Sequence, residues 1–148
     1  MTISNCRFTI DIMTPDDLKK RTKEFGLRVI RLVEALPKTQ TSAVIGKQLL
    51  DCATSVGANY RAACKGKSKA DFIAKLGIVE EEADESIYWL EMLVEAKIIR
   101  LNLIAELLAE ANELTAIIAT SRITAKKNKK NRNSQIENRR LLYLGSGT

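Results

Sequence analysis

Residues 52–94 read CATSVGANYRAACKGKSKADFIAKLGIVEEEADESIYWLEMLV and decide the fold of this chain. Apolar residues recur at helical spacing on both sides of a short polar turn at 65–68. The upstream stripe comprises Leu49, Val56, Tyr60 and Ala63, and the downstream stripe Phe72, Leu76, Val79, Ala83 and Leu90. Gly66 is placed to end the first helix with a positive φ, and Ser68 with Asp71 forms a near capping box for the second. The stretch therefore predicts two helices folded back on each other.

The remaining apolar pattern adds one helix before this pair and one after it. Thr14 is a suitable N-cap and Pro15 a suitable first residue for the earlier helix, which Pro37 ends. The later helix begins near Asn102 and carries the heptad seam Ile104, Leu107, Ala111, Leu114 and Ile118. The expected helices span about 15–36, 42–64, 69–97 and from 102 onward. Because the loops are short, we predict an all-α, antiparallel up-down four-helix bundle.

Composition divides the chain into three segments. Residues 1–13 show no helical periodicity and form an N-terminal extension, and residues 14–125 form the four-helix bundle. Residues 126–148 form a basic C-terminal tail with seven Lys/Arg and one Glu, whereas residues 1–125 hold 17 basic and 17 acidic side chains. The whole net charge of +6 therefore lies in the tail. Its Asn, Ser and Gly residues predict disorder from about residue 133, with the fourth helix extending only a turn or two past 126.

The chain contains no histidine, which removes the most common general base and a common metal ligand. The acidic run at 80–85 lacks the Glu-x-x-His pairs of di-iron bundles, so surface or intersubunit ion pairing is the simpler interpretation. No nucleophile–base pair or phosphate-binding glycine loop can be assembled either. We therefore predict that the protein is not an enzyme and has no metal site and no cofactor.

Three features concern the cellular location. No apolar run of 18 residues is present to span a membrane, and the N-terminus does not resemble a signal peptide. Cys6, Cys52 and Cys64 are odd in number and lack metal-type spacing, which fits free thiols in a reducing compartment. The predicted location is the cytoplasm, with no membrane partner.

Basic residues are expected to gather at one end of the bundle, here called the basic pole. In an up-down topology the start of the first helix, the turn at 65–68 and the end of the fourth helix share that end. The candidate nucleic-acid-binding residues are Lys65, Lys67, Lys69, Lys126, Lys127, Lys129, Lys130 and Arg132, joined by Lys19, Lys20, Arg21, Lys23 and Arg61. Such a pole would bind a polyanion and release its counterions. Because the cluster contains no aromatic residue, binding is predicted to depend on backbone and shape rather than base identity.

Large apolar residues at 88–94 cover nearly the whole circumference of the third helix, more than one stripe of a monomeric bundle can bury. The fourth helix adds a second face of small residues. The candidate oligomer-interface residues are Tyr88, Trp89, Met92, Leu93, Ala105, Ala109 and Ala116. Self-association is the preferred interpretation, and a thick core around Trp89 within one subunit is the alternative.

The central stretch also resembles a known bacterial family. The matching residues are Ser55-Val-Gly-Ala-Asn-Tyr-Arg-Ala-Ala, Ser68, Asp71-Phe72, Lys75-Leu76, Glu81-Glu82 and Tyr88-Trp89-Leu90. They are similar to the four-helix-bundle proteins first named for intervening sequences of 23S rRNA genes. The accessory variability determinant proteins of diversity-generating retroelements are more distant members. The likeness extends over about residues 13–125.

The resemblance implies a homopentameric, non-enzymatic bundle. It also implies a pairing of Asn59 or Arg61 with Glu81 or Glu82, and a glycine near the position of Lys97.

These observations favour a nucleic-acid-associated scaffold or accessory protein. Its ring-like homo-oligomer would concentrate the basic poles and bind structured RNA or an RNA–protein complex. A reverse transcriptase is a possible partner by analogy with the retroelement proteins. The alternative function is a protein–protein adaptor whose basic tail confers only solubility.

Overall fold

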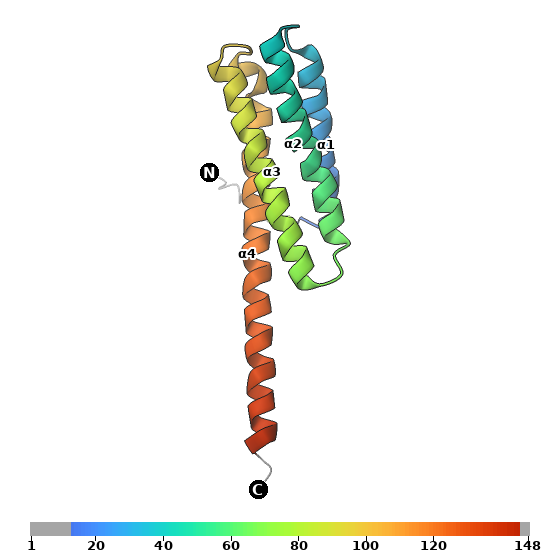
Figure 1. Cartoon of the computed structure of the whole chain (residues 1–148), viewed down its shortest axis with the longest axis vertical. Helices are drawn as coiled ribbons and strands as arrows, with labels where there is room; N and C mark the ends of the chain where they lie inside the picture. The colour runs from blue at the N-terminus through green and yellow to red at the C-terminus, as the bar shows by residue number, and fades with distance from the viewer. Residues whose placement is uncertain (1–12, 146–148) are drawn as a thin grey trace, which may run out of the picture.

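The computed structural model describes residues 13–145, except for the side chains of Asn138 and residues 140–145. This range consists of four α-helices and the connections between them. The helices are α1 (Pro15–Ala35), α2 (Gln40–Cys64), α3 (Lys69–Glu95) and α4 (Leu101–Gly145), with no strand in this range. The α1–α2 and α3–α4 connections lie at one end of the bundle and the α2–α3 turn at the other (Figure 1). The all-α prediction is confirmed, with helix starts within two residues of those expected.

The N-terminal extension expected at residues 1–13, except Met13 itself, lies outside the described residues together with Cys6. None of the described helices is long and apolar enough to cross a membrane.

Side-chain caps fix where α1 and α3 begin. The Thr14 hydroxyl accepts a hydrogen bond from the Asp17 N–H at 3.1 Å, and the Asp17 carboxylate accepts one from the Thr14 N–H at 3.1 Å. This capping box confirms the predicted N-cap. At α3 the Ser68 hydroxyl accepts from the Asp71 N–H at 3.1 Å, but the Asp71 carboxylate accepts from the Lys67 N–H at 3.0 Å. Only half of the predicted capping box therefore forms, and the other half braces the preceding turn.

The backbone of the tight turns differs from the sequence prediction. Gly66 does not have a positive φ, so the predicted left-handed helix cap is wrong. Glycine is needed there for space, because a Cβ would lie 3.0 Å from the Ala63 carbonyl oxygen and 3.2 Å from the Phe72 nitrogen. Among the described non-glycine residues, a positive φ occurs at Lys97, at 57° in the α3–α4 connection. This is the position where the resemblance implies a glycine, and an L-residue there is strained by about 1 kcal/mol.

One apolar core lies between the four helices. Its members without any exposed surface include Val29, Leu49, Val56, Leu76, Val79, Leu90, Leu114 and Ile118. All five residues of the predicted α4 seam are buried, which confirms that seam. α1 and α2 approach closely at a glycine, since a Cβ on Gly57 would lie 3.3 Å from the Thr22 carbonyl oxygen. The members of the stripes predicted around residues 52–94 are buried except Phe72, which is half-buried and packs against the core.

α1 and α4 have the smallest contact of the adjacent helix pairs, and one arginine links them. Arg21 donates from Nε and Nη2 to the two carboxylate oxygens of Glu110, each at 2.7 Å, and its Nη2 lies 2.8 Å from Glu113 Oε2. The hydrogen bond to Glu110 raises the pKa of Arg21 above its ordinary value. Arg21 therefore clamps α1 to α4, which corrects its assignment to the basic pole.

The C-terminal part of α4 departs most from the sequence prediction. The helix continues without interruption to Gly145 and projects beyond the α2–α3 turn (Figure 1). The predicted disorder is therefore wrong for residues 133–145. Ala125 is the last buried residue of α4, and every described side chain after it is exposed. We call residues 126–145 the α4 extension.

Candidate nucleic-acid interface

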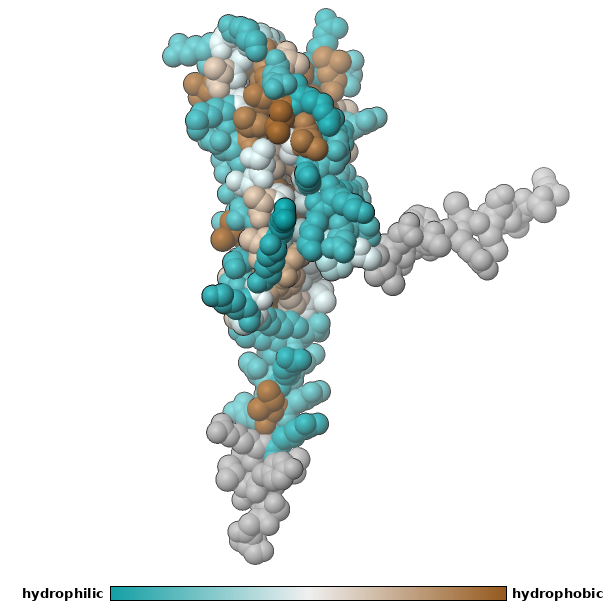
Figure 2. All heavy atoms as spheres, turned by 90° about the vertical axis from the view of Figure 1, so that its right-hand side faces the viewer, coloured by the Kyte–Doolittle hydropathy of each residue, from teal (hydrophilic) through white to brown (hydrophobic). Residues whose placement is uncertain are grey.

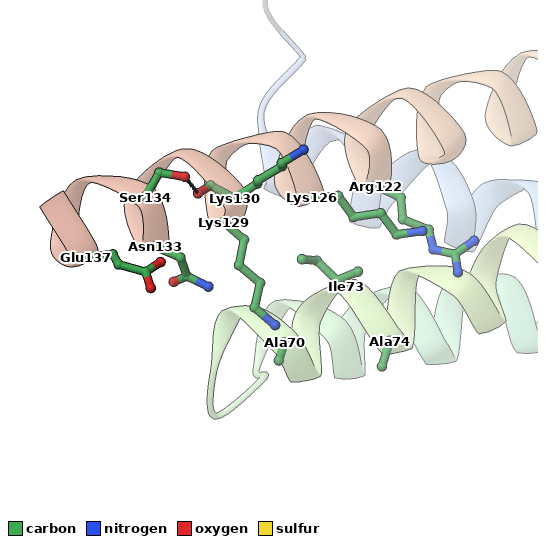
Figure 3. Close-up of a pocket in the computed structure, with 10 residues that line it drawn as sticks. All are labelled: Ala70, Ile73, Ala74, Arg122, Lys126, Lys129, Lys130, Asn133, Ser134 and Glu137. Carbon is green, nitrogen blue, oxygen red and sulfur yellow. Dashed lines mark hydrogen bonds between the residues drawn. The ribbon is translucent and has the colours of Figure 1, made fainter.

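Eight of the basic residues predicted to bind nucleic acid lie at the α2–α3 turn or on the α4 extension. Lys65, Lys67 and Lys69 lie at the end of α2, in the turn and at the start of α3, and all three are exposed. Lys126, Lys127, Lys129, Lys130 and Arg132 lie on the first two turns of the extension and are exposed too. Figure 3 shows the start of α3 alongside this part of α4. The structure thus brings the two groups to the same end of the bundle.

A groove of about 530 Å³ separates the start of α3 from α4. Its α4 wall includes Lys126, Lys129 and Lys130, and its α3 wall is formed by Ala70, Ile73 and Ala74. Lys129 extends from α4 toward Ala70, whereas Lys130 points away from α3 (Figure 3). Small residues on α3 leave room beside the ammonium groups. We call this the α3/α4 groove.

Arg122 lines the end of the α3/α4 groove nearest Gly77, and the sequence prediction missed it. Its Nη1 donates to Glu80 Oε2 at 3.0 Å, while its Nε is buried without a hydrogen-bond partner among the described residues. The guanidinium lies flat against α3 because residue 77 is glycine; a Cβ there would be 3.0 Å from the Arg122 Cζ. In the sequence, the acidic Glu80 one turn after Gly77 was the feature that indicated a cationic partner on another helix. Arg122 therefore provides a cation in a fixed position at the end of the groove nearest Gly77.

The remaining cations of the basic pole line a different groove. A cavity of about 630 Å³ between α1 and α2 is bordered by Lys19, Lys20, Lys23, Arg61 and Lys65, with Leu27 and Ile30 along its apolar side. We call this the α1/α2 groove. Lys67, Lys69, Lys127 and Arg132 line neither groove. The cations expected to form a single basic pole therefore line two separate grooves or lie outside both.

One carboxylate lies among the cations of the turn. Asp71 Oδ2 accepts from Lys75 Nζ at 2.9 Å and from the Lys67 N–H at 3.0 Å, and these bonds lower the pKa of Asp71. Its charge is therefore directed at Lys75 and the turn backbone. The side-chain ammonium groups of Lys65, Lys67 and Lys69 form no ion pair among the described residues.

The acidic run at 80–85 is placed differently from the pairing that the resemblance implied. Glu80 pairs with Arg122 on α4. Among the described residues, no side-chain hydrogen bond or ion pair joins Asn59 or Arg61 on α2 to Glu81 or Glu82. Burial, together with the charges of Glu85 and Glu81, raises the pKa of Glu82. Within residues 13–145, no three His, Cys, Asp or Glu side chains are arranged to hold a metal ion.

The residues proposed for an oligomer interface have different exposures. Tyr88 is 52% exposed and stacks edge-on against Trp89, with ring centroids 4.9 Å apart. Trp89 is half-buried and donates its indole N–H to Glu85 at 3.0 Å. Met92 is half-buried, and Ala105, Ala109 and Ala116 are exposed on α4. Leu93 is completely buried inside the subunit, so it cannot belong to an interface and that assignment is corrected.

Apolar and polar surfaces are separated along the molecule. On the face in Figure 2, apolar side chains gather near the end that carries the α1–α2 connection, whereas the described part of the α4 extension is mostly hydrophilic. Exposed apolar residues missed by the sequence prediction include Leu101 and Leu103 at the start of α4, the latter 69% exposed.

The profile of the 23S rRNA-intervening sequence proteins matches residues 16–120. The chain belongs to this family. The matched residues include α1, α2, α3 and the buried seam of α4. They end before Arg122 and the basic residues of the α4 extension, so the α4 side of the α3/α4 groove lies outside the part that defines the family.

A solved relative supports the membership. The crystal structure of a protein of unknown function from the S23 ribosomal protein family of Bacteroides thetaiotaomicron VPI-5482 is 33% identical, with a TM-score of 0.68. The match covers 73% of this chain and 96% of that chain. A comparison with curated proteins gives no significant match.

Proposed function

We propose that this member of the 23S rRNA-intervening sequence family is a non-enzymatic scaffold that binds structured RNA, or an RNA–protein complex, through the α3/α4 groove. The observation that carries the proposal is the unpaired charge of Lys126, Lys129 and Lys130 beside a bundle whose own charges balance. Each phosphate neutralised there would release counterions, which is the main source of affinity for a polyanion.

The non-enzymatic part of the proposal is supported by Cys52, the buried one of the two cysteines that the structure describes. Cys52 accepts a hydrogen bond at Sγ from the Ser86 hydroxyl at 3.2 Å. Burial raises the pKa of Cys52 to about 11, so its thiol is protonated at neutral pH and is a poor nucleophile. Cys52 therefore acts as a packing residue.

We further propose that the subunits, with consecutive helices antiparallel, assemble into a pentameric ring through the exposed face around Tyr88. Replacing Trp89 or Met92 with Glu should then produce smaller particles in light scattering, with helicity by circular dichroism retained. Loss of helicity in both variants would place these side chains in the subunit core and contradict the interface. A reverse transcriptase is one protein that such a ring could recruit.

RNA binding is tested by its salt dependence. If one subunit neutralises about four phosphates, the logarithm of the binding constant should fall with the logarithm of salt concentration with a slope of about −3 to −4. Replacing Lys126, Lys127, Lys129 and Lys130 together with Ala should weaken binding to all sequences and flatten this slope. Lys65, Lys67 and Lys69 should add to the loss. Lys97 and Arg100, at the opposite end of the bundle, provide the matched control.

Equal losses from the two ends would contradict a localised interface. Absence of salt-sensitive binding would contradict the RNA function as a whole.

The α1/α2 groove supports the second candidate function, a protein–protein adaptor. Leu27 and Ile30 give that groove an apolar side that a phosphate backbone does not need, and its lysines would suit an acidic protein partner. Nucleic acid co-purifying with the protein, seen as a high 260/280 absorbance ratio lost in high salt, would favour the scaffold over the adaptor.

A further inference from the structure

The α4 extension has two faces of different chemistry. Its lysine face is the one that lines the α3/α4 groove. It carries Lys126, Lys129 and Lys130, followed by Asn133, Ser134 and one carboxylate, Glu137. At about 100° per residue, Asn128, Asn131, Arg132, Gln135 and Arg139 fall on the opposite side of the helix. All five are exposed. We call this second set the amide face.

The two faces suit different parts of a nucleic acid. A lysine ammonium is a compact charge that pairs well with a phosphate but carries little geometric information. Asn, Gln and Arg side chains are planar and can form paired hydrogen bonds with base edges, Asn and Gln with adenine and Arg with guanine. The amide face therefore has the chemistry of base recognition and the lysine face that of backbone binding.

The scarcity of aromatic residues points to a groove rather than to a single strand. Sequence-tolerant binding of unpaired bases depends on stacking against aromatic rings, and residues 126–142 contain none; the first in the extension is Tyr143, near its end. An α-helix with its side chains is roughly 10–12 Å wide and fits a wide major groove, whereas the major groove of uninterrupted A-form RNA is too narrow and deep. An RNA stem admits a helix where a bulge or internal loop opens that groove.

The helix also needs its ligand. None of its described side chains after Ala125 is buried, and like charges face each other at Lys126 and Lys130, one helical turn apart. Phosphates beside the lysine face would remove this repulsion, so binding and helix stability are expected to increase together.

We propose that the amide face of the α4 extension recognises base edges in the major groove of an RNA stem widened by a bulge or internal loop, while the lysine face holds the flanking phosphates. This proposal rests on the proposed RNA-binding function and names its ligand class. It replaces the expectation that binding would be independent of base identity.

The test separates the two faces by charge. The amide variant, Asn128→Ala with Asn131→Ala and Gln135→Ala, removes no charge and introduces a better helix former at each position. The lysine variant, Lys126→Ala with Lys129→Ala and Lys130→Ala, removes three charges. The full-length protein would be used to select RNA from a pool of stems of about 20 base pairs with a randomised centre, some uninterrupted and some with a bulge of about three nucleotides.

Wild-type protein should enrich bulged stems, and the selected stem should bind at least about tenfold more tightly than its uninterrupted counterpart. The amide variant should lose this preference while its salt slope stays unchanged. The lysine variant should weaken binding to both stems and flatten the slope.

Enrichment of uninterrupted stems, or an amide variant that keeps the preference, would overturn the proposal. Tighter binding of a DNA duplex of the same length than of the selected stem would overturn RNA as the ligand. If uninterrupted stems are enriched or the amide variant keeps the preference, RNA binding and its salt dependence still persist. Failure of base recognition is therefore distinguishable from failure of the proposed function.

Discussion

The four-helix core and the α4 extension are continuous in one helix but are held by different forces. Up to Ala125, α4 buries a regular seam against the other helices, and the chain's charges balance. After Ala125 no described side chain is buried, and the net charge is strongly positive. The core is therefore stabilised by apolar burial, and the extension by its backbone hydrogen bonds alone. The comparison indicates that the core fixes the position of a helix whose free part is available to a ligand.

The family profile matches only residues in the core, which fits this division. Packing determines the fold that the family shares. The extension differs from this core in its positive charge and its exposed hydrogen-bonding groups.

The largest difference between the two regions is expected from substitutions to alanine. Leu90→Ala removes a side chain with no exposed surface and should lower the free energy of unfolding by about 3 kcal/mol. Lys130→Ala, on the extension, should change it by less than about 0.5 kcal/mol. Urea unfolding followed by circular dichroism measures both. A loss below about 1 kcal/mol for Leu90→Ala would mean that the core is loosely packed.

A smaller effect is expected at the link between α1 and α4. Arg21→Ala leaves the Glu110 carboxylate, 17% exposed, without its partner and should lower the free energy of unfolding by about 2 kcal/mol. Arg31→Ala is the matched control, because the Arg31–Glu24 pair at 3.3 Å is more than half exposed on both sides. Similar losses for the two arginines would show that the clamp contributes no more than a surface ion pair.

A substitution in the strained α3–α4 connection is expected to increase the stability of the core rather than decrease it. Lys97→Gly should raise the free energy of unfolding by about 1 kcal/mol, because glycine adopts a φ of 57° without steric strain. Lys67→Gly, where φ is not positive, should give no gain. Thermal unfolding of both variants would decide the point, and a lower melting temperature for Lys97→Gly would contradict the strain argument.

The smallest effect is expected from removing most of the extension. Truncation after Asn133 should shift the melting temperature by less than about 4 °C, because no described residue beyond Ala125 is buried. Truncation after Thr120 removes Arg122 and Ala125 and should lower it clearly. A large shift from the shorter deletion would show that the extension packs on the core and would remove the contrast between the two regions.

The amino-acid sequence by itself determined the helices and most of the core. Helix starts depend on local signals such as Thr14 and Ser68, and the buried stripes follow from the 3.6-residue period of apolar side chains. The length of α4 could also have been predicted, because no Gly or Pro occurs between residues 101 and 144. The prediction of disorder gave the polar composition more weight than this uninterrupted run, whereas in the structure α4 continues to Gly145.

Tertiary structure decided the features that depend on which helices are neighbours. Arg21 pairs with Glu110 of α4 and so does not contribute a free charge to the basic pole. Arg122 lines the α3/α4 groove because Gly77 of α3 leaves room for its guanidinium. Leu93 is buried because α2 and α4 both pack against α3. Helical periodicity specifies the direction of a side chain about its own axis, but only the packing of four axes determines what that side chain meets.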